Sequence, residues 1–142
     1  MMITPRTLGQ ILREKGVITD GQLKKAVALK DSMSIRLDEA IIKLGFLGAE
    51  DILHGFAEQF DLKIVNPLDI SIPDTVIHAV PKEIAKKYHI IPVDKQKGLL
   101  TVAITNPLDL SISDDLRFTL NTEIECVLST HEKIEKAIIQ WW

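Results

Sequence analysis

The first sixty residues contain one pattern twice, and this repeat constrains the fold more than any other feature of the sequence. Leu8 and Leu37 lie 29 positions apart, and Gly16 and Gly45 repeat at the same offset. Further apolar positions repeat with them, namely Val17-Ile18 with Phe46-Leu47, Leu23 with Ile52, and Val27 with Phe56. Such a repeat is typical of one supersecondary unit used twice, in which each copy needs the other to bury its apolar face. We therefore predict a helical subdomain over residues 1–60, with copies at about 7–30 and 36–59.

Each copy predicts a short helix, a glycine stop and a second helix. The apolar residues of the first helix share one face: Leu8, Ile11 and Leu12. Gly16 follows at the position of a left-handed C-terminal cap, and Thr19 with Gln22 forms a capping-box pattern that starts the next helix. In the second copy Gly45 is the stop, whereas Gly48 replaces the threonine and weakens that cap by a few tenths of a kcal/mol at most. The repeat thus predicts four helices in two similar pairs.

The pattern changes after Phe60 from paired helices to a mixture of helices and strands. The expected elements are a short apolar run at 62–65, two short helices within 74–88, an antiparallel hairpin of 90–93 and 99–105 with its turn at 94–98, a helix at 111–120, a strand at 122–128 and a last helix capped by Thr130. Pro73 and Pro81 each fit the first turn of a helix. We therefore predict the α+β class, with a mixed subdomain over 61–142 and a sheet of three to four strands.

Composition excludes several classes of function. Of the 142 residues, 46% are hydrophobic and 26% are charged, which is typical of a globular chain with a real core. A net charge of −3 lacks the positive field of a protein that binds nucleic acid through many phosphates. No apolar run approaches the roughly 20 residues that span a bilayer, and the N-terminus lacks a signal-peptide pattern. We therefore expect a cytoplasmic chain that neither binds nucleic acid nor inserts into the membrane.

The side chains that could carry redox or metal chemistry are few. One cysteine, Cys126, lies in an apolar strand-like run and is expected to be a buried packing residue. The histidines lack the paired spacing of a zinc site: His54, His78, His89 and His131. We predict neither a metal site nor a catalytic residue.

Three sequence segments in the second half carry a family resemblance. They are PKEIAKKY at 81–88, IIPV at 90–93 and LTVAITNPLD at 100–109, and they follow the double helix-glycine-helix repeat in a fixed order. This order resembles the N-terminal domain of type II secretion and type IV pilus assembly ATPases over nearly the whole chain. The resemblance implies a domain that precedes a hexameric motor and docks on membrane assembly-platform proteins or on the motor itself. The resemblance also implies a regulatory ligand, because some members of this family bind cyclic di-GMP.

The motor itself is not expected in this chain. No Gly-x-x-x-x-Gly-Lys-Ser/Thr occurs in the sequence, so the phosphate-binding loop of such ATPases cannot be built from it. The chain is therefore predicted to be no enzyme. Two origins stay open, a fragment preceding a motor and a stand-alone copy of the domain.

The resemblance also implies where cyclic di-GMP would bind. The family motif opens with Arg-Leu-Gly, has a glycine after the first helix and closes with glutamine. Matching residues in the second copy are Arg36, Leu37, Gly45 and Gln59, and those in the first are Leu8, Gly9 and Gly16. The departures are Asp38 for the motif's third-position glycine in the second copy, and Thr7 for arginine and Lys30 for glutamine in the first. Arg6 lies one position early.

Two interpretations of these residues remain open. Arginine can stack on guanine and pair with phosphate, whereas a carboxylate such as Asp38 repels phosphate. Arg36 and Gln59 can equally be ordinary exposed helix residues, and the two repeated glycines can be helix stops alone. The leading hypothesis is accordingly a non-catalytic docking and regulatory domain, and the alternative is a cyclic di-GMP sensor with a partly degenerate motif.

Overall fold

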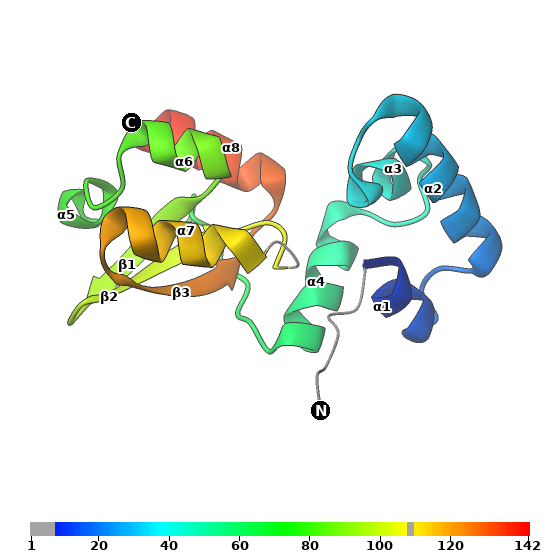
Figure 1. Cartoon of the computed structure of the whole chain (residues 1–142), viewed down its shortest axis with the longest axis horizontal. Coiled ribbons are helices and arrows are strands. Elements are labelled where there is room, and N and C mark those ends of the chain that lie inside the picture. The colour runs from blue at the N-terminus through cyan, green and yellow to red at the C-terminus, as the bar shows by residue number, and fades with distance from the viewer. Residues whose placement is uncertain (1–7, 108–109) are drawn as a thin grey trace. The chain divides into compact units, whose positions relative to one another are not determined.

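The computed structural model describes residues 8–107 and 110–142. Its contacts divide the chain into two compact units, one ending at Gln59 and one spanning Phe60–Trp142. Figure 1 labels the elements of each unit along the chain. Among the described residues, no helix is long and apolar enough to cross a membrane.

The first unit is formed by two helix pairs, as the repeat predicted. The helices are α1 (Leu8–Glu14), α2 (Asp20–Met33), α3 (Leu37–Lys43) and α4 (Ala49–Phe60). Gly16 follows α1 with φ 72° and Gly45 follows α3 with φ 74°, so both repeated glycines adopt the left-handed conformation that ends a helix. The predicted helix-glycine-helix order is therefore confirmed in both copies.

The starts of α2 and α4 show how local side chains define the repeat. The Thr19 hydroxyl accepts a hydrogen bond from the Gln22 backbone at 3.1 Å, and the Gln22 side chain accepts one from the Thr19 backbone at 3.0 Å. This is the predicted capping box. In the second copy, the Asp51 carboxylate accepts from the Gly48 backbone at 3.0 Å. The second copy thus keeps the half of the box that does not need a threonine.

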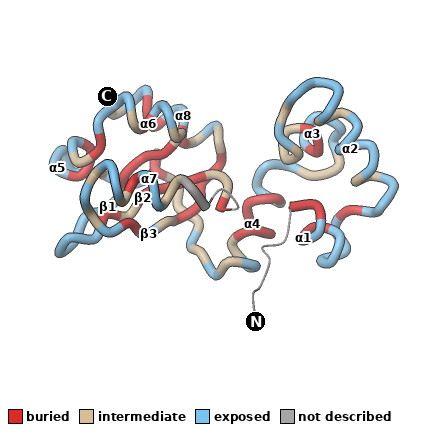
Figure 2. Tube along the Cα trace, viewed as in Figure 1, coloured by how far each residue is buried: buried red, intermediate tan, exposed pale blue. Residues whose placement is uncertain are grey.

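The core of the first unit lies mainly along α1, α3 and α4 (Figure 2), and both members of the repeat pairs Ile11–Ala40 and Leu12–Ile41 are buried. Its buried apolar residues are Leu8, Ile11, Leu12, Ile18, Ala26, Ala40, Ile41, Ile52, Leu53 and Phe56. Burying one such large side chain stabilises the unit by about 1.5–3 kcal/mol. The repeat pair Val27 and Phe56 is not equivalent in burial, since Val27 is 40% exposed whereas Phe56 is 3% exposed. Only Ala26 of α2 is fully buried, so α2 presents a narrower apolar face than α4.

The second unit is a three-stranded mixed sheet with helices around it. Its elements are α5 (Asp74–Ile77), α6 (Lys82–Tyr88), β1 (Ile91–Gln96), β2 (Leu99–Ile104), α7 (Leu110–Leu120), β3 (Glu123–Leu128) and α8 (His131–Trp141). The strand order is β1-β2-β3, with β1 antiparallel and β3 parallel to the central β2. Ile64 adds a single parallel bridge beside Leu128. The predicted α+β class and the predicted sheet are therefore confirmed.

Helices and loops cover both faces of the central strand. Val102 and Ala103 are adjacent in β2, so their side chains point to opposite faces, and both are fully buried. Contacts join α8 to β1 and β2, α7 to β3, and α5 to β1. The predicted apolar stripe of α8 is buried at Ile134, Ala137 and Ile138. Thr130 caps this helix by accepting from the Lys133 backbone at 3.2 Å.

Three details differ from the sequence expectations. The hairpin turn is shorter than 94–98, because β1 continues to Gln96 and only Lys97 and Gly98, with φ 47° and 82°, remain between the strands. A two-residue turn with both φ positive matches the twist of the paired strands. The prolines at 73 and 81 occupy the N-cap positions of α5 and α6 rather than their first turns. Cys126 is half-buried instead of fully buried.

Candidate functional site

The seven residues predicted for a ligand site all belong to the first unit, whereas Arg6 and Thr7 fall outside the described residues. They are Leu8 and Gly9 in α1, Gly16 after it, Arg36 and Leu37 at the start of α3, Gly45 after α3, and Gln59 near the end of α4. Helix α1 packs against both α2 and α3, so the openings of the two copies lie on neighbouring helices. An ion pair between Lys15 and Glu58 ties the end of α1 to the last turn of α4. The glycine turn of the first copy therefore lies near the closing glutamine of the second.

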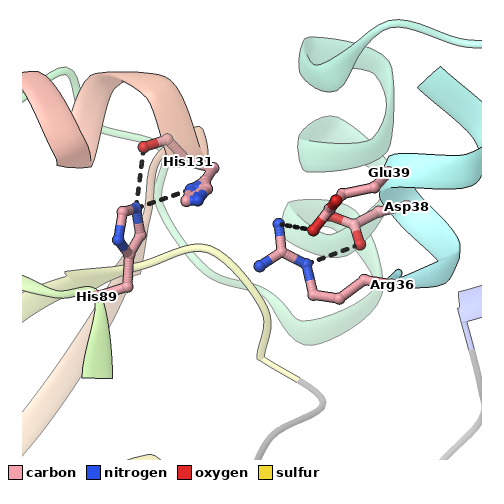
Figure 3. A network of polar contacts seen from close by, with 5 residues as sticks. All are labelled: Arg36, Asp38, Glu39, His89 and His131. Carbon is pink, nitrogen blue, oxygen red and sulfur yellow. Dashed lines mark hydrogen bonds and ion pairs between the residues drawn. The ribbon is translucent and has the colours of Figure 1, made fainter. Parts of the chain in front are cut away.

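Arg36 is held by two carboxylates at the start of its own helix. Its Nε donates to Asp38 Oδ1 at 3.1 Å, and its Nη2 lies 3.2 Å from Glu39 Oε1 (Figure 3). The Arg36 side chain is 45% exposed and that of Asp38 only 17%. The guanidinium thus reaches solvent, but two of its nitrogens already have anionic partners. We call Arg36, Asp38 and Glu39 the arginine clamp.

The arginine clamp is only partly predictable from the sequence. The sequence predicts that the Asp38 carboxylate repels phosphate, but it does not predict the ion pair of Asp38 with Arg36. Glu39 lies three positions after Arg36, which is a recognised spacing for an ion pair on a helix and could have indicated this contact. The arginine that the sequence singled out is therefore the centre of an internal ion-pair cluster with one excess negative charge.

The motif glycines have different structural reasons. A Cβ placed on Gly16 or Gly45 would meet nothing within 4 Å, so the positive φ alone favours glycine there. A Cβ on Gly9 would lie 2.9 Å from Leu23 Cδ1, because α1 packs closely on α2 at this point. Helix ends and helix packing therefore explain these glycines without a ligand.

The closing positions of the two copies also differ. Gln59 is exposed, and Lys30, its counterpart in the first copy, pairs with Asp31 at 3.3 Å. Close to this part of α2, a shallow hollow of about 440 Å³ is lined by Arg13, Asp20, Leu23, Lys24 and Val27. The hollow combines an apolar patch with charges of both signs.

The second unit brings together two histidines that are 42 positions apart. His131 Nδ1 lies 2.9 Å from His89 Nε2, which also lies 3.0 Å from the His131 carbonyl oxygen (Figure 3). Because a carbonyl oxygen can only accept, His89 Nε2 is assigned as the donor, and its single N–H is then shared between that carbonyl and Nδ1 of His131. The pair joins the residue that ends α6 to the first residue of α8. Sequence spacing gave no signal for it.

The remaining reactive groups of the described residues are a thiol and scattered carboxylates. Burial raises the pKa of the Cys126 thiol, with a smaller raising effect from Glu125, while Arg117 lowers it. The thiol therefore stays protonated near neutral pH and is a poor nucleophile. Within residues 8–107 and 110–142, no group of three or more histidine, cysteine, aspartate or glutamate side chains could hold a metal ion. A groove of about 550 Å³ beside β3 is lined by apolar residues, by the acidic residues Asp61, Asp94 and Glu125, and by Lys63, Ser71 and Thr101.

Comparison with known families decides what kind of domain this is. The family model of the MshEN domain matches residues 60–141, which is more than half of the chain. The chain belongs to the MshEN domain family. The resemblance that the sequence indicated is confirmed, since the MshEN domain is homologous to N-terminal domains of type IV pilus and type II secretion ATPases.

Individual relatives agree with this assignment over most of the chain. Type IV pilus assembly ATPase PilB of Myxococcus xanthus (strain DK1622) is 28% identical over 135 residues, which are 95% of this chain and 24% of PilB. The chain thus spans about a quarter of the length of this relative. A structure of MshE with cdg (cyclic di-GMP) matches with a TM-score of 0.86 at 22% identity, covering 97% of this chain and 100% of that one. The N-terminal domain of XpsE matches with a TM-score of 0.80 at 20% identity, covering 99% of each chain.

Proposed function

We propose that this MshEN domain is a non-catalytic docking and regulatory domain, which binds either an assembly-platform protein or a motor ATPase of the pilus or secretion type. The observation that carries the proposal is Phe118 on α7, whose side chain is 90% exposed. Ile139 on α8 is 75% exposed in the same unit. Large aromatic side chains dominate the binding energy of many protein interfaces, so an aromatic side chain this exposed is a natural anchor for a partner.

The partner classes follow from the relatives. PilB is a type IV pilus assembly ATPase, and this chain matches only about a quarter of it. The matched part is an N-terminal domain rather than a motor, which supports a role in contacts rather than in hydrolysis. We place the protein at the cytoplasmic side of the inner membrane, held there by its protein partner. In this proposal, the subdomain over 61–142 provides the docking surface, and the subdomain over 1–60 carries any ligand residues.

The docking proposal is tested by biolayer interferometry with the immobilised chain. Its analytes are the purified cytoplasmic part of a pilus assembly-platform protein and, separately, a PilB-type motor. Phe118→Asp should weaken binding about ten- to hundredfold, because burying an aromatic side chain contributes about 1.5–3 kcal/mol. Thr119→Asp is the matched control. Thr119 is the next exposed residue of α7, and its replacement by aspartate adds the same charge. Equal affinities for both variants and the wild type would remove Phe118 from the interface.

Cyclic di-GMP sensing is a second candidate function. It is favoured by the likeness to MshE with cdg over 97% of this chain and by the presence of Arg36, Gly45 and Gln59 at motif positions. Leu37 and the first-copy residues Leu8, Gly9 and Gly16 would complete such a site. Isothermal titration with cyclic di-GMP, with GTP as the control at matched ionic strength, measures it directly. Micromolar or tighter selective binding supports sensing, and no binding leaves docking as the function.

A further inference from the structure

The arginine clamp uses the guanidinium that an anionic ligand of the second copy would need. Asp38 and Glu39 contact two different nitrogens of Arg36, at 3.1 and 3.2 Å. An arginine fork binds phosphate through the same nitrogen donors. Asp38 is the less exposed of the two carboxylates, at 17% against 37%, so it is the better held partner.

We infer that Asp38 is a specificity-determining residue. Its carboxylate acts as an internal ligand of the Arg36 guanidinium and thereby prevents phosphate-bearing ligands from binding to the second copy. The inference rests on the second candidate function, because it concerns the same arginine. A phosphate group that approaches Arg36 must displace Asp38 and Glu39 and then lie beside two negative charges. Both effects weaken the binding of an anion without any change in the fold.

Only the second copy has a carboxylate at the repeat position of Asp38. Gly9 occupies the position that corresponds to Asp38 in the repeat. A Cβ at Gly9 would lie 2.9 Å from Leu23 Cδ1, so close helix packing disfavours a side chain there. The second copy accommodates Asp38 and orients it toward Arg36. The same repeat position thus serves packing in one copy and charge neutralisation in the other.

The test compares the affinity of the whole chain for cyclic di-GMP with and without the Asp38 charge. Asp38→Asn keeps the size of the side chain and suits the first turn of a helix, while Asp38→Gly also removes the side chain. We expect each variant to bind cyclic di-GMP at least about tenfold more tightly than the wild type, and GTP without comparable gain. Titration calorimetry measures all three proteins at the same salt concentration.

A second arginine provides the matched control. Arg117 on α7 is 42% exposed and is also paired with two carboxylates, Asp114 at 3.1 Å and Glu123 at 3.3 Å. Asp114→Asn removes the same charge from a similar cluster outside the repeat. This variant should keep the wild-type affinity for cyclic di-GMP, which separates release of Arg36 from a general gain of positive charge.

The arginine clamp itself can be observed without any ligand. Hydrogen exchange of the Arg36 Nε–H, followed by nuclear magnetic resonance, should be slower in the wild type than in Asp38→Asn. Equal exchange rates would overturn the inference, as would affinities for cyclic di-GMP that stay within threefold across the wild type and both Asp38 variants. The wild-type affinity alone decides the sensing function, so wild-type binding with no gain in the variants refutes the role of Asp38 and leaves sensing intact.

Discussion

Replacing Gly45 by alanine tests whether the repeated glycines are helix stops. A left-handed conformation costs a residue with a Cβ about 1–2 kcal/mol, and the reduced entropy of the unfolded chain returns about 0.4–1 kcal/mol. Because a Cβ at Gly45 would meet nothing within 4 Å, no further steric term applies. Taking the centre of each range, the free energy of unfolding should therefore fall by about 0.8 kcal/mol. In urea this corresponds to a midpoint lower by about 0.4 M, for an m-value of about 2 kcal/mol/M.

Two matched variants make this prediction sharp. Gly45→Asn should lose less stability than Gly45→Ala, because asparagine tolerates the left-handed region better. Gly21 lies inside α2, where its Cβ would approach only the Thr19 hydroxyl at 4.0 Å, so Gly21→Ala should raise the midpoint. Far-ultraviolet circular dichroism follows the loss of helix in the chain during unfolding. The helix-stop argument fails when Gly45→Ala is neutral or stabilising, or when asparagine is worse than alanine.

Two further predictions concern ionisable groups of the second unit. Cys126 should react with iodoacetamide at pH 8 more slowly than a free cysteine in a peptide, because burial raises its pKa, and an equal rate would contradict this. The pKa of Glu132 should lie below its ordinary value and rise in Lys136→Ala, because the Lys136 ammonium donates a hydrogen bond to it at 2.8 Å. A lowered carboxyl pKa stabilises the fold above the unfolded pKa, and this contribution disappears as the pH falls through the folded value. Carboxyl titration by nuclear magnetic resonance checks the shift, and an unchanged pKa in the variant would rule out Lys136 as its cause.

The parts of the fold that sequence predicted are those set by neighbouring residues. The left-handed glycines, the Thr19–Gln22 capping box and the Thr130 cap each depend on a few positions along the chain, so their side-chain chemistry specifies them. The hairpin and its turn were predicted, but the turn was predicted too long, because Asp94 to Gln96 pair with β2 although they are polar. Backbone pairing at a sheet edge does not require an apolar side chain.

The parts that sequence missed depend on residues distant in the chain or on competition between local partners. The contact between His89 and His131 joins the ends of two helices that only the folded sheet brings together. Val27 fits the helical spacing of a buried face, yet it is exposed, and Ala26 is the residue of α2 that is fully buried. Arg36 had several possible partners, and the sequence could not choose between a ligand phosphate and the two acids that follow it.

The two copies share their scaffold but differ at the repeat positions of Asp38 and Gln59, where the first copy has Gly9 and Lys30. Both keep the left-handed glycine and the helix pair around it, which the fold itself requires. The second copy has Arg36 with two carboxylates and an exposed Gln59, whereas Lys30 at the closing position of the first copy pairs with Asp31. Cyclic di-GMP is a symmetric dinucleotide, so two copies with unlike charges would hold its halves unequally. The repeat is thus better suited to form a stable scaffold than a symmetric ligand clamp, and this favours docking as the primary function.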